Sequence, residues 1–335
     1  MDSFIDVAPL SVNRTGLDRD ALSGNVAVIT GGGGNIGMAT ARSLAWLGAR
    51  VVIGEINPQV GDRAAKYINY ENKEGAALFI ETDITNEESV KTMYEKTIGT
   101  FGKVDILIHA AMDMSLGNDI MNTTVDVFNK QYAISARGAL LCIQALVPGM
   151  LERHRGVVTY LASAFRHPTA PSNYCAAKAA TSSMIMSLAS ELGSVDDTGV
   201  AVFTMVPGWV GRPTSGENNA ATSRFPGANI GYEERMPPED LAAALSYAVV
   251  HASEIHGSGI TAGQVLKYIG WKFPRPDLVP ERDFARLRDS AAVRIFGYLG
   301  QGFARPEDPT VSIDYNDSQP NESYNFITLM GLESE

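Results

Sequence analysis

The sequence is poor in cysteine and in positive charge, and it has no long apolar run. Its two cysteines, Cys142 and Cys175, cannot build a disulfide framework for 335 residues, so we expect a reducing compartment and a cytoplasmic location. The formal net charge of −11 disfavours nucleic acid and anionic membranes as partners. Without a run of about 18 apolar residues, or a basic and then apolar N-terminal segment, we expect neither a membrane span nor a secretory signal.

Short apolar runs alternate with stretches of helical spacing between Gly24 and about Gly270. A strand that is covered by helices on both sides of a parallel sheet must be apolar on both faces, and these runs meet that condition. The pattern predicts a single α/β domain, a Rossmann-type doubly wound parallel sheet of about seven strands. The expected strands are 26–30, 51–54, 77–80, 106–109, 156–162, 200–206 and 264–269.

Two ends and one internal segment fall outside this alternation. We expect an N-terminal leader over residues 1–21, the α/β domain over 22–270 and a C-terminal extension over 271–335. The extension is acidic at its end, because residues 301–335 carry six of the eleven net negative charges. Within the domain, residues 212–236 are rich in Gly, Asn, Ser and Pro and are too long for an ordinary connection, which predicts a lid loop or a disordered segment.

Four consecutive glycines follow the first expected strand and precede a helix. Backbone N–H groups at a helix N-terminus can hold a pyrophosphate only where no Cβ blocks the approach or the turn. The run fits both G-x-G-x-x-G and T-G-x-x-G-x-x-G, so it indicates a dinucleotide site without fixing the subtype; a tight turn without a ligand is the alternative. The expected cofactor contacts are Gly31, Gly33, Gly34, Asn35, Ile36 and Gly37.

Glu55 ends the second expected strand, eighteen residues after Gly37. A carboxylate there accepts hydrogen bonds from the adenosine ribose and repels a 2′-phosphate. No Lys or Arg lies in the turn or directly after the strand to offset this charge. We therefore expect NAD as the cofactor in preference to NADP, with a merely solvated strand-end acid as the alternative for Glu55.

Tyr174 and Lys178 stand four residues apart in an expected helix, so their side chains share one face. A phenol has a pKa of about 10, and a neighbouring ammonium lowers it toward the range useful for acid/base catalysis. Ser163 follows an expected strand eleven residues before Tyr174, where its hydroxyl can polarise a carbonyl. Alone, the tyrosine and lysine are a weak signal, but together with the glycine turn and the serine they form a specific combination.

The order and spacing of these motifs resemble the short-chain dehydrogenase/reductase family in its compact single-domain type, over residues 22–270. The larger, extended members share the second glycine pattern but have a longer interval between serine and tyrosine. The motifs that carry the resemblance are Thr30-Gly-Gly-Gly-Gly-Asn-Ile-Gly37, Thr82-Asp-Ile-Thr85, Ser163, Tyr174-x-x-x-Lys178, Pro207-Gly-Trp-Val210 and Met236-Pro-Pro-Glu-Asp-Leu with Ile260-Thr-Ala-Gly-Gln264.

The resemblance implies roles for the reactive side chains. It implies Tyr174 as the general acid/base, Ser163 orienting the substrate oxygen, and Lys178 holding the nicotinamide ribose while lowering the pKa of Tyr174. By the same resemblance Asp83 and Ile84 flank the adenine. The other cofactor contacts that it implies are His109, Ala110, Ala111, Pro207, Gly208, Val210 and Thr214.

Three positions depart from the family pattern. His109-Ala-Ala-Met stands where the family has Asn-Asn-Ala-Gly, and Thr214 lies two places after the position of the family threonine, which is Arg212. Ser135 replaces the helix asparagine that feeds a water relay to the lysine, and it can serve a shortened relay through one more water. His109 is either a new proton carrier or a strand-end histidine bonded to backbone near the cofactor.

The resemblance also places apolar side chains around the nicotinamide. Met112, Phe165 and Trp209, with Met114, predict a bulky, mostly apolar alcohol or ketone, unless these side chains belong to the core. We expect no metal, and a homodimer or homotetramer built on helices within 122–150 and 173–192.

The function that follows is an NAD(H)-dependent oxidoreductase that interconverts a secondary alcohol and a ketone. One alternative is a non-redox enzyme of the same fold, an isomerase, dehydratase or cyclase with a structural cofactor. Another is a cofactor-sensing protein, which has no need of the serine, tyrosine and lysine set.

Overall fold

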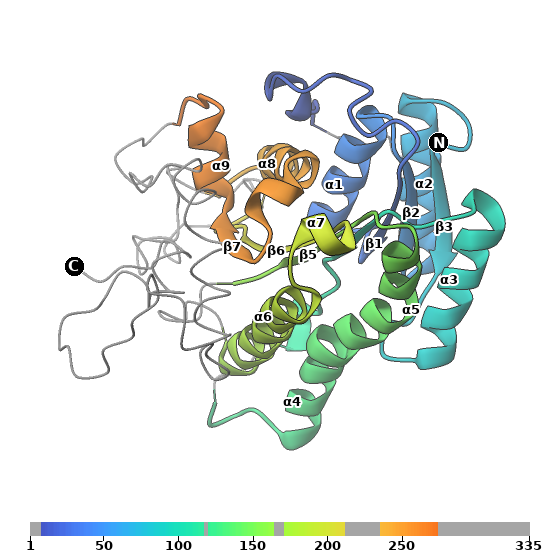
Figure 1. Ribbon diagram of the computed structural model, residues 1–335. Coiled ribbons are helices and arrows are strands. Elements are labelled where there is room, and N and C mark those ends of the chain that lie inside the picture. The colour runs from blue at the N-terminus through green and yellow to red at the C-terminus, as the bar shows by residue number, and fades with distance from the viewer. Residues whose placement is uncertain (1–7, 117–119, 164–170, 212–234, 274–335) are drawn as a thin grey trace, which may run out of the picture.

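The computed structural model describes residues 8–116, 120–163, 171–211 and 235–273, and the structural statements below concern these residues. Seven parallel strands form one sheet in the order β3-β2-β1-β4-β5-β6-β7, with helices on both faces (Figure 1). This confirms the Rossmann-type α/β fold. The strands are β1 Val26–Thr30, β2 Arg50–Glu55, β3 Ala77–Glu81, β4 Ile106–His109, β5 Gly156–Leu161, β6 Val200–Val206 and β7 Ser258–Thr261.

Alternate residues of each strand pack into two hydrophobic layers, one on each face of the sheet. Ala27 and Ile29 of β1 join the layer that contains α1, α2, α8 and α9, whereas Val26 and Val28 join the layer of α3, α5 and α6. The helices are α1 Asn35–Trp46, α2 Pro58–Glu71, α3 Glu87–Phe101, α4 Val125–Tyr132, α5 Gly138–Glu152, α6 Ser172–Leu192, α7 Val195–Thr198, α8 Pro238–Val250 and α9 Ala262–Tyr268, with a π-helical segment, η3 Ala133–Arg137, between α4 and α5.

The last expected strand, 264–269, is wrong. Residues 264–268 belong to α9 and Ile269 is its C-cap, whereas β7 lies just before the helix, paired in parallel with β6. The backbone N–H of Gln264 donates to Thr261 Oγ1 (3.1 Å), and the backbone N–H of Thr261 donates to Gln264 Oε1 (2.9 Å). This capping box satisfies donors of the first turn and so starts a helix in an apolar run that also fits a buried strand.

The part of the expected leader that the structure describes packs against the sheet domain. Ser11 Oγ donates to Asp240 Oδ1 of α8 (2.5 Å), and the Arg14 guanidinium lies 3.8 Å from the centroid of the Trp271 ring. The short 3-10 helix η1, Val12–Arg14, buries Val12 completely. This segment therefore contributes to the core.

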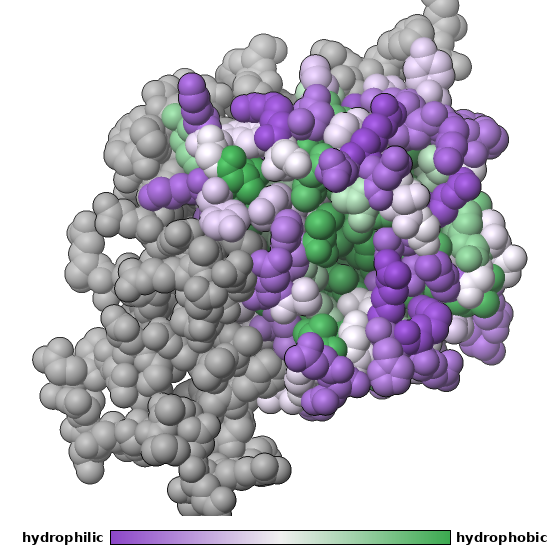
Figure 2. Space-filling model, turned by 45° about the horizontal axis from the view of Figure 1, so that its top comes forward, coloured by the Kyte–Doolittle hydropathy of each residue, from purple (hydrophilic) through white to green (hydrophobic). Residues whose placement is uncertain are grey.

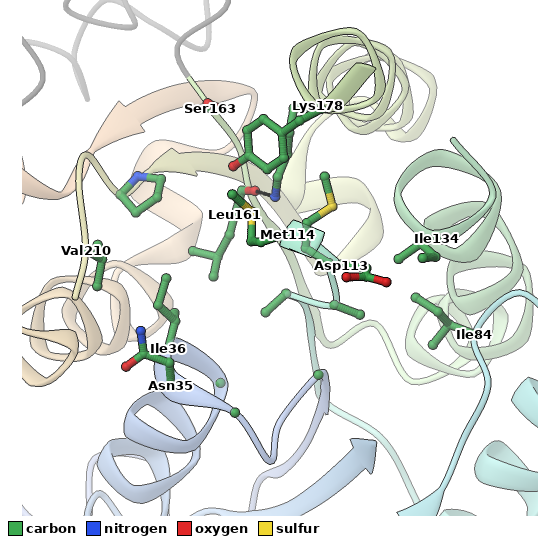
Figure 3. A pocket seen from close by; sticks show the side chains of 18 of the residues that line it. Asn35, Ile36, Ile84, Asp113, Met114, Ile134, Leu161, Ser163, Lys178 and Val210 are labelled. Carbon is green, nitrogen blue, oxygen red and sulfur yellow. Dashed lines mark hydrogen bonds between the residues drawn. The ribbon is translucent and has the colours of Figure 1, made fainter. Parts of the chain in front are cut away.

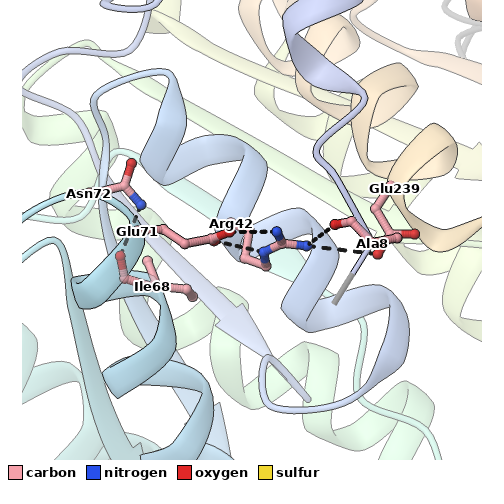
Figure 4. A network of polar contacts seen from close by, with 6 residues as sticks. All are labelled: Ala8, Arg42, Ile68, Glu71, Asn72 and Glu239. Atoms are coloured by element: carbon pink, nitrogen blue, oxygen red, sulfur yellow. Dashed lines mark hydrogen bonds and ion pairs between the residues drawn. The ribbon is translucent and has the colours of Figure 1, made fainter. Parts of the chain in front are cut away.

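A buried arginine joins α1 to its neighbours (Figure 4). Arg42 donates through Nε and Nη2 to the two carboxylate oxygens of Glu71 on α2 (2.8 and 2.6 Å). Its Nη1 donates to the carbonyl oxygen of Ala8 (3.1 Å) and lies 3.8 Å from Glu239 Oε1 on α8. One guanidinium thus connects α1, α2, α8 and the N-terminal segment.

The described surface mixes polar and apolar side chains. In Figure 2, hydrophilic residues cover most of the visible described face, and apolar residues gather in its middle. The helical run Val125–Glu152 is long and apolar enough to cross a membrane, but 50% of its most apolar window is buried inside the fold. A core helix meets the same test, so the run is a weak indication of a membrane span.

Candidate active site

A cavity of about 820 Å³ opens beyond the carboxyl ends of the strands, near the neighbours β1 and β4, where the strand order reverses. Open α/β sheets bind ligands at this place because the loops from the two halves diverge there. In Figure 3, Ile36 and Val210 lie on one side of the cavity, Ile84 and Ile134 lie on the other, and Lys178 points in between them.

Most of the predicted site residues line this cavity, although they come from distant parts of the chain. The predicted residues that line it are Gly31, Gly34, Asn35, Ile36, Gly37, Glu55, Asp83, Ile84, Ala110, Ala111, Met112, Ser163, Tyr174, Lys178, Pro207, Gly208, Trp209 and Val210. Gly33, His109 and Ser135 are buried and do not line the cavity. Phe165, Thr214 and most of the expected lid lie outside the described residues.

The glycine turn needs its glycines for different reasons. Gly31 has φ +65°, and a Cβ there would lie 2.8 Å from Ala111 Cα in the loop after β4. A Cβ on Gly33 would lie 2.9 Å from Val60 Cγ1 of α2. Gly34, the N-cap of α1, has no atom within 4 Å of such a Cβ and faces open space. Packing thus accounts for the first two glycines but not for Gly34.

Glu55 lies at the carboxyl end of β2 and lines the cavity beside the glycine turn. Its Oε1 accepts a hydrogen bond from the backbone N–H of Asn57 (3.1 Å), which orients the carboxylate. Asn57 in turn caps α2, because its Oδ1 accepts from the N–H groups of Gln59 and Val60. The loop after β2 is therefore held by its own polar side chains.

Tyr174 and Ser163 meet at the cavity. Tyr174 lies in the first turn of α6 and lines the cavity together with Ser163, which follows the end of β5. Burial raises the pKa of Tyr174 above its ordinary value, and the Ser163 hydroxyl offsets part of that rise. The net shift in this structure is thus opposite to the lowering by Lys178 that the sequence predicts.

Lys178 is a buried cation, 4% exposed, one turn after Tyr174. Its Nζ donates to the carbonyl oxygen of Leu161 (2.5 Å), as drawn in Figure 3, and lies 4.6 Å from the centroid of the Tyr160 ring. Burial lowers the pKa of Lys178 to about 7, because the desolvated ammonium is less stable than the amine. Its charge state therefore changes near neutral pH.

His109 ends β4 and is bonded on both ring nitrogens. Its Nε2 lies 3.1 Å from the carbonyl oxygen of Ser135, and its Nδ1 lies 3.0 Å from Thr30 Oγ1. Because a carbonyl only accepts, Nε2 carries the proton and Thr30 donates to Nδ1. Thr30 Oγ1 also accepts from the N–H groups of Ala110 and Ala111 (3.1 and 3.2 Å). These bonds favour the strand-end histidine over the proton carrier.

The Ser135 side chain belongs to a second buried chain of hydroxyls. Ser135 Oγ lies 2.8 Å from Tyr160 Oη and 2.8 Å from Thr181 Oγ1, and Thr181 donates to the carbonyl oxygen of Ala177 (2.8 Å). Since the Thr181 proton is committed, Ser135 donates to Thr181 and accepts from Tyr160. Both polar groups of Ser135 are thus engaged, and its relay to the lysine stays a prediction.

Several cavity residues escaped the sequence analysis. Arg235 and Lys130 add positive charge to the lining, and Leu161 offers the carbonyl that binds the lysine. Arg235 directly precedes the Met236-Pro-Pro motif, so the sequence already indicated that it lies near the site. Tyr160, the one aromatic residue in the strand β5, was a further signal, because a buried phenol requires a hydrogen-bond partner.

Comparison with known proteins gives the family. The family model for short chain dehydrogenases matches residues 25–223. An uncharacterized oxidoreductase of Staphylococcus saprophyticus is 30% identical over 246 residues, which cover 73% of this chain and 99% of the relative. Another, from Thermotoga maritima, is 31% identical over 191 residues, 56% of this chain and 72% of the relative. The chain therefore belongs to the short-chain dehydrogenase/reductase family of oxidoreductases.

Solved structures agree with this assignment. A 3-ketoacyl-(acyl-carrier-protein) reductase from Brucella melitensis, complexed with NADH, is 27% identical with a TM-score of 0.62, covering 72% of this chain and 97% of the other. A short chain dehydrogenase from Bacillus anthracis is 26% identical with a TM-score of 0.63, covering 72% and 95%. Both likenesses cover nearly the whole of the other chain, so the additional residues of this protein lie beyond the shared domain.

Proposed function

We propose that this protein is an NAD(H)-dependent oxidoreductase that interconverts a secondary alcohol and a ketone. One observation carries the proposal: Tyr174, Ser163 and Lys178 line the same cavity as the glycine turn. A proton donor and a carbonyl-polarising hydroxyl therefore stand within one enclosure with a site suited to a dinucleotide. The family membership supports a redox reaction, and the NADH complex of the Brucella reductase supports a nicotinamide cofactor.

The residues of the turn suit a dinucleotide. The space in front of Gly34 is open, so a pyrophosphate can approach the N-terminus of α1, where backbone N–H groups lack intrahelical partners. Glu55 would accept the adenosine ribose hydroxyls, which favours NAD over NADP. When bound, the nicotinamide supplies or accepts the hydride.

The chain's own side chains would handle the proton. Tyr174 Oη gives its proton to the ketone oxygen in reduction and takes the hydroxyl proton in oxidation, while Ser163 hydrogen-bonds the same oxygen. The raised pKa of Tyr174 keeps the phenol protonated at neutral pH, which is the form that reduction needs. Lys178, one helical turn away, would hold the nicotinamide ribose and favour the phenolate after the proton has left.

The substrate side of the cavity supports an apolar substrate. Met112 and Trp209 line it, and Met114 lies there with 61% of its surface exposed. Exposed apolar side chains at a cavity are available to a ligand, whereas core residues are not. A bulky, mostly apolar ketone or alcohol fits this lining.

We also propose that the protein is a cytoplasmic homodimer or homotetramer. Apolar side chains on α4 and α5 remain exposed in the single chain: Val125 (74%), Phe128 (41%), Tyr132 (45%) and Leu140 (40%). A second copy of this helix pair would bury them. Native mass spectrometry tests this, and a monomer at micromolar concentration would contradict it.

The substitution Tyr174→Phe tests the enzymatic role. Removing the proton donor should lower turnover of a reactive ketone about 10²–10⁴-fold, because that is the usual contribution of a general acid. Binding of NADH, measured by fluorescence, should change by no more than about twofold. Tyr70→Phe, at an 86% exposed position outside the lining, is the matched control and should keep full activity.

A panel of cyclic and linear ketones with NADH deuterated at C4 tests the reaction class. The proposal expects the label in the product alcohol of at least one ketone. Tight NADH binding without transfer of the deuterium label to any ketone of the panel would contradict the redox assignment. Substrate loss without a net change in NADH would instead support the non-redox alternative.

A further inference from the structure

Lys178 has no carboxylate partner among the residues that the structure describes. Its Nζ has one hydrogen-bond acceptor, the Leu161 carbonyl, and lies over two aromatic rings, 4.6 Å from the centroid of Tyr160 and 5.7 Å from that of Tyr174. A buried cation needs compensation for lost hydration, and one carbonyl supplies only part of it. The nearer ring face offers a further part, because aromatic faces attract ammonium groups within about 6 Å.

The Tyr160 ring cannot turn away from this cation. Tyr160 lies in the middle of the sheet on β5 and is fully buried. Its hydroxyl donates to Ser135 Oγ of η3, which donates to Thr181 of α6, which donates to the Ala177 carbonyl. The polar end of the phenol is thus held by η3 and, through Ser135, by α6, and these bonds fix the orientation of the ring.

His109 packs on the same ring. The two rings are stacked, with centroids 5.8 Å apart and an angle of 26° between their planes. The bonds of His109 to Thr30 and Ser135 fix its ring, and burial together with the charge of Lys178 lowers its pKa to about 3, so it stays neutral beside the cation. Among the described residues, the ionisable groups that contact Lys178 are His109 from β4, Tyr160 from β5 and Tyr174 from its own helix.

We propose that Tyr160 is a positioning residue for Lys178. The ring face of Tyr160 holds the Lys178 ammonium at the cavity, and Ser135, Thr181 and His109 fix the orientation of that ring. The proposal rests on the proposed function only in assigning Lys178 to the active site. The proposal also explains how Lys178 is accommodated without a carboxylate partner. The Leu161 carbonyl accepts one N–H of the ammonium, and the Tyr160 ring stabilises its charge. The remaining N–H groups of Nζ stay available to a ligand in the cavity.

The test compares Tyr160→Phe with Tyr160→Leu in the full chain. Phenylalanine keeps the ring face and loses the hydroxyl, whereas leucine loses both. The pKa of Lys178 is read from the ¹³Cε resonance of ¹³C-lysine protein, assigned by its loss in Lys178→Arg. We expect titration near pH 7 in the parent, a value about one unit lower in Tyr160→Leu, and a value close to the parent in Tyr160→Phe.

A fluorinated series keeps the test decisive if the leucine variant does not fold. Phenylalanine carrying one, two or three fluorines at position 160 keeps the shape of the ring, while each fluorine withdraws electron density from the ring face and weakens its attraction for a cation. The Lys178 pKa should fall stepwise with fluorine number. A pKa that is unaffected by fluorination, or equal shifts in Tyr160→Phe and Tyr160→Leu, would overturn the proposal. Because this readout needs no substrate, it stands apart from the activity test on Tyr174.

Catalysis provides a second readout. In Tyr160→Leu the turnover number should fall about tenfold with KM changed far less, because the lysine is misplaced while the substrate side of the cavity remains. Tyr160→Phe should recover most of that loss. A turnover number that falls as far in Tyr160→Phe as in Tyr160→Leu, with circular dichroism showing folded protein, would assign Tyr160 a purely structural role.

Discussion

A side-chain carbon on Gly37 would lie 2.1 Å from the carbonyl oxygen of Gly31, well inside van der Waals contact. The first residue of the turn and the first turn of α1 therefore touch through backbone alone. Gly31 cannot move aside, because its N–H donates to the carbonyl oxygen of Gly54 on β2 (2.7 Å) and its Cα packs closely against the backbone of Ala111. The close approach brings the helix N-terminus to the carboxyl end of the sheet.

Gly37→Ala should therefore damage both stability and cofactor binding. The added methyl group forces the turn open, and we expect a loss of at least about 3 kcal/mol in the free energy of unfolding. Urea denaturation measures the first effect and NADH fluorescence the second. An alanine variant with parental stability would contradict the packing described for the turn.

Gly34→Ala is the matched variant in the same turn. Its Cβ meets no atom within 4 Å and its φ of −96° suits any residue, so stability should change by no more than about 0.5 kcal/mol. A cofactor that approaches the backbone here would clash with the methyl group, and its Kd should rise about tenfold or more. Unchanged NADH affinity would place the pyrophosphate elsewhere.

Arg42→Met should destabilise the domain. The substitution removes a buried guanidinium that donates twice to Glu71, and it leaves Glu239, 2% exposed, without the cation 3.8 Å away. Breaking a buried pair on one side costs about 3 kcal/mol or more. The control is Lys66→Ala, which breaks an exposed pair with Asp62 and should cost at most about 0.5 kcal/mol. Urea denaturation of both variants makes the comparison.

His109 should make the protein sensitive to acid. Its pKa falls from 6.5 in the unfolded chain to about 3 in the fold, so below pH 6.5 the unfolded chain binds a proton that the folded chain does not. The free energy of unfolding therefore falls as the pH drops from 6.5 toward 3, by at most about 1.4 kcal/mol per pH unit.

His109→Gln removes this titration and tests it. The variant starts from lower stability, because it loses the bonds to Thr30 and Ser135, but its stability should fall less steeply between pH 6.5 and 4.5. His256, whose pKa burial also lowers, stays in both proteins and cancels in the comparison. Parallel slopes in urea denaturation at stepped pH would show that His109 binds protons equally in the folded and the unfolded chain, and so that its pKa is not lowered by folding.

Glu55→Ser should weaken the preference for NADH. Without the carboxylate, a 2′-phosphate meets no fixed negative charge at the end of β2, and the ratio of kcat/KM for NADPH to that for NADH should rise about tenfold or more. Glu81→Ser is the matched control. Glu81 of β3 pairs in register with Glu55 of β2, but it is exposed and lies outside the cavity lining. Equal ratios in the two variants would leave the preference unexplained by Glu55.

The local patterns were strong predictors of the secondary elements. The first six expected strands lie within one residue of β1 to β6, because an uninterrupted apolar run between turns has few other uses in an α/β chain. The seventh failed because the reciprocal bonds of Thr261 and Gln264 outweigh the composition of the run that follows. A pattern of side chains cannot show where two particular groups bond.

The sequence alone determined the glycine turn, the Tyr174 and Lys178 pair on one helical face, and the acid at the end of β2, since each is a short-range feature set by neighbouring residues. Only the tertiary structure decided the surroundings of Lys178. The bonds that link His109, Ser135, Tyr160 and Thr181 to one another join residues 25 to 46 positions apart in the chain. The parallel pairing of β4 and β5 sets His109 beside Tyr160. The directions of these hydrogen bonds and the desolvation of the Lys178 charge follow from contacts between residues that are distant in the chain, and no local spacing of residues predicts them.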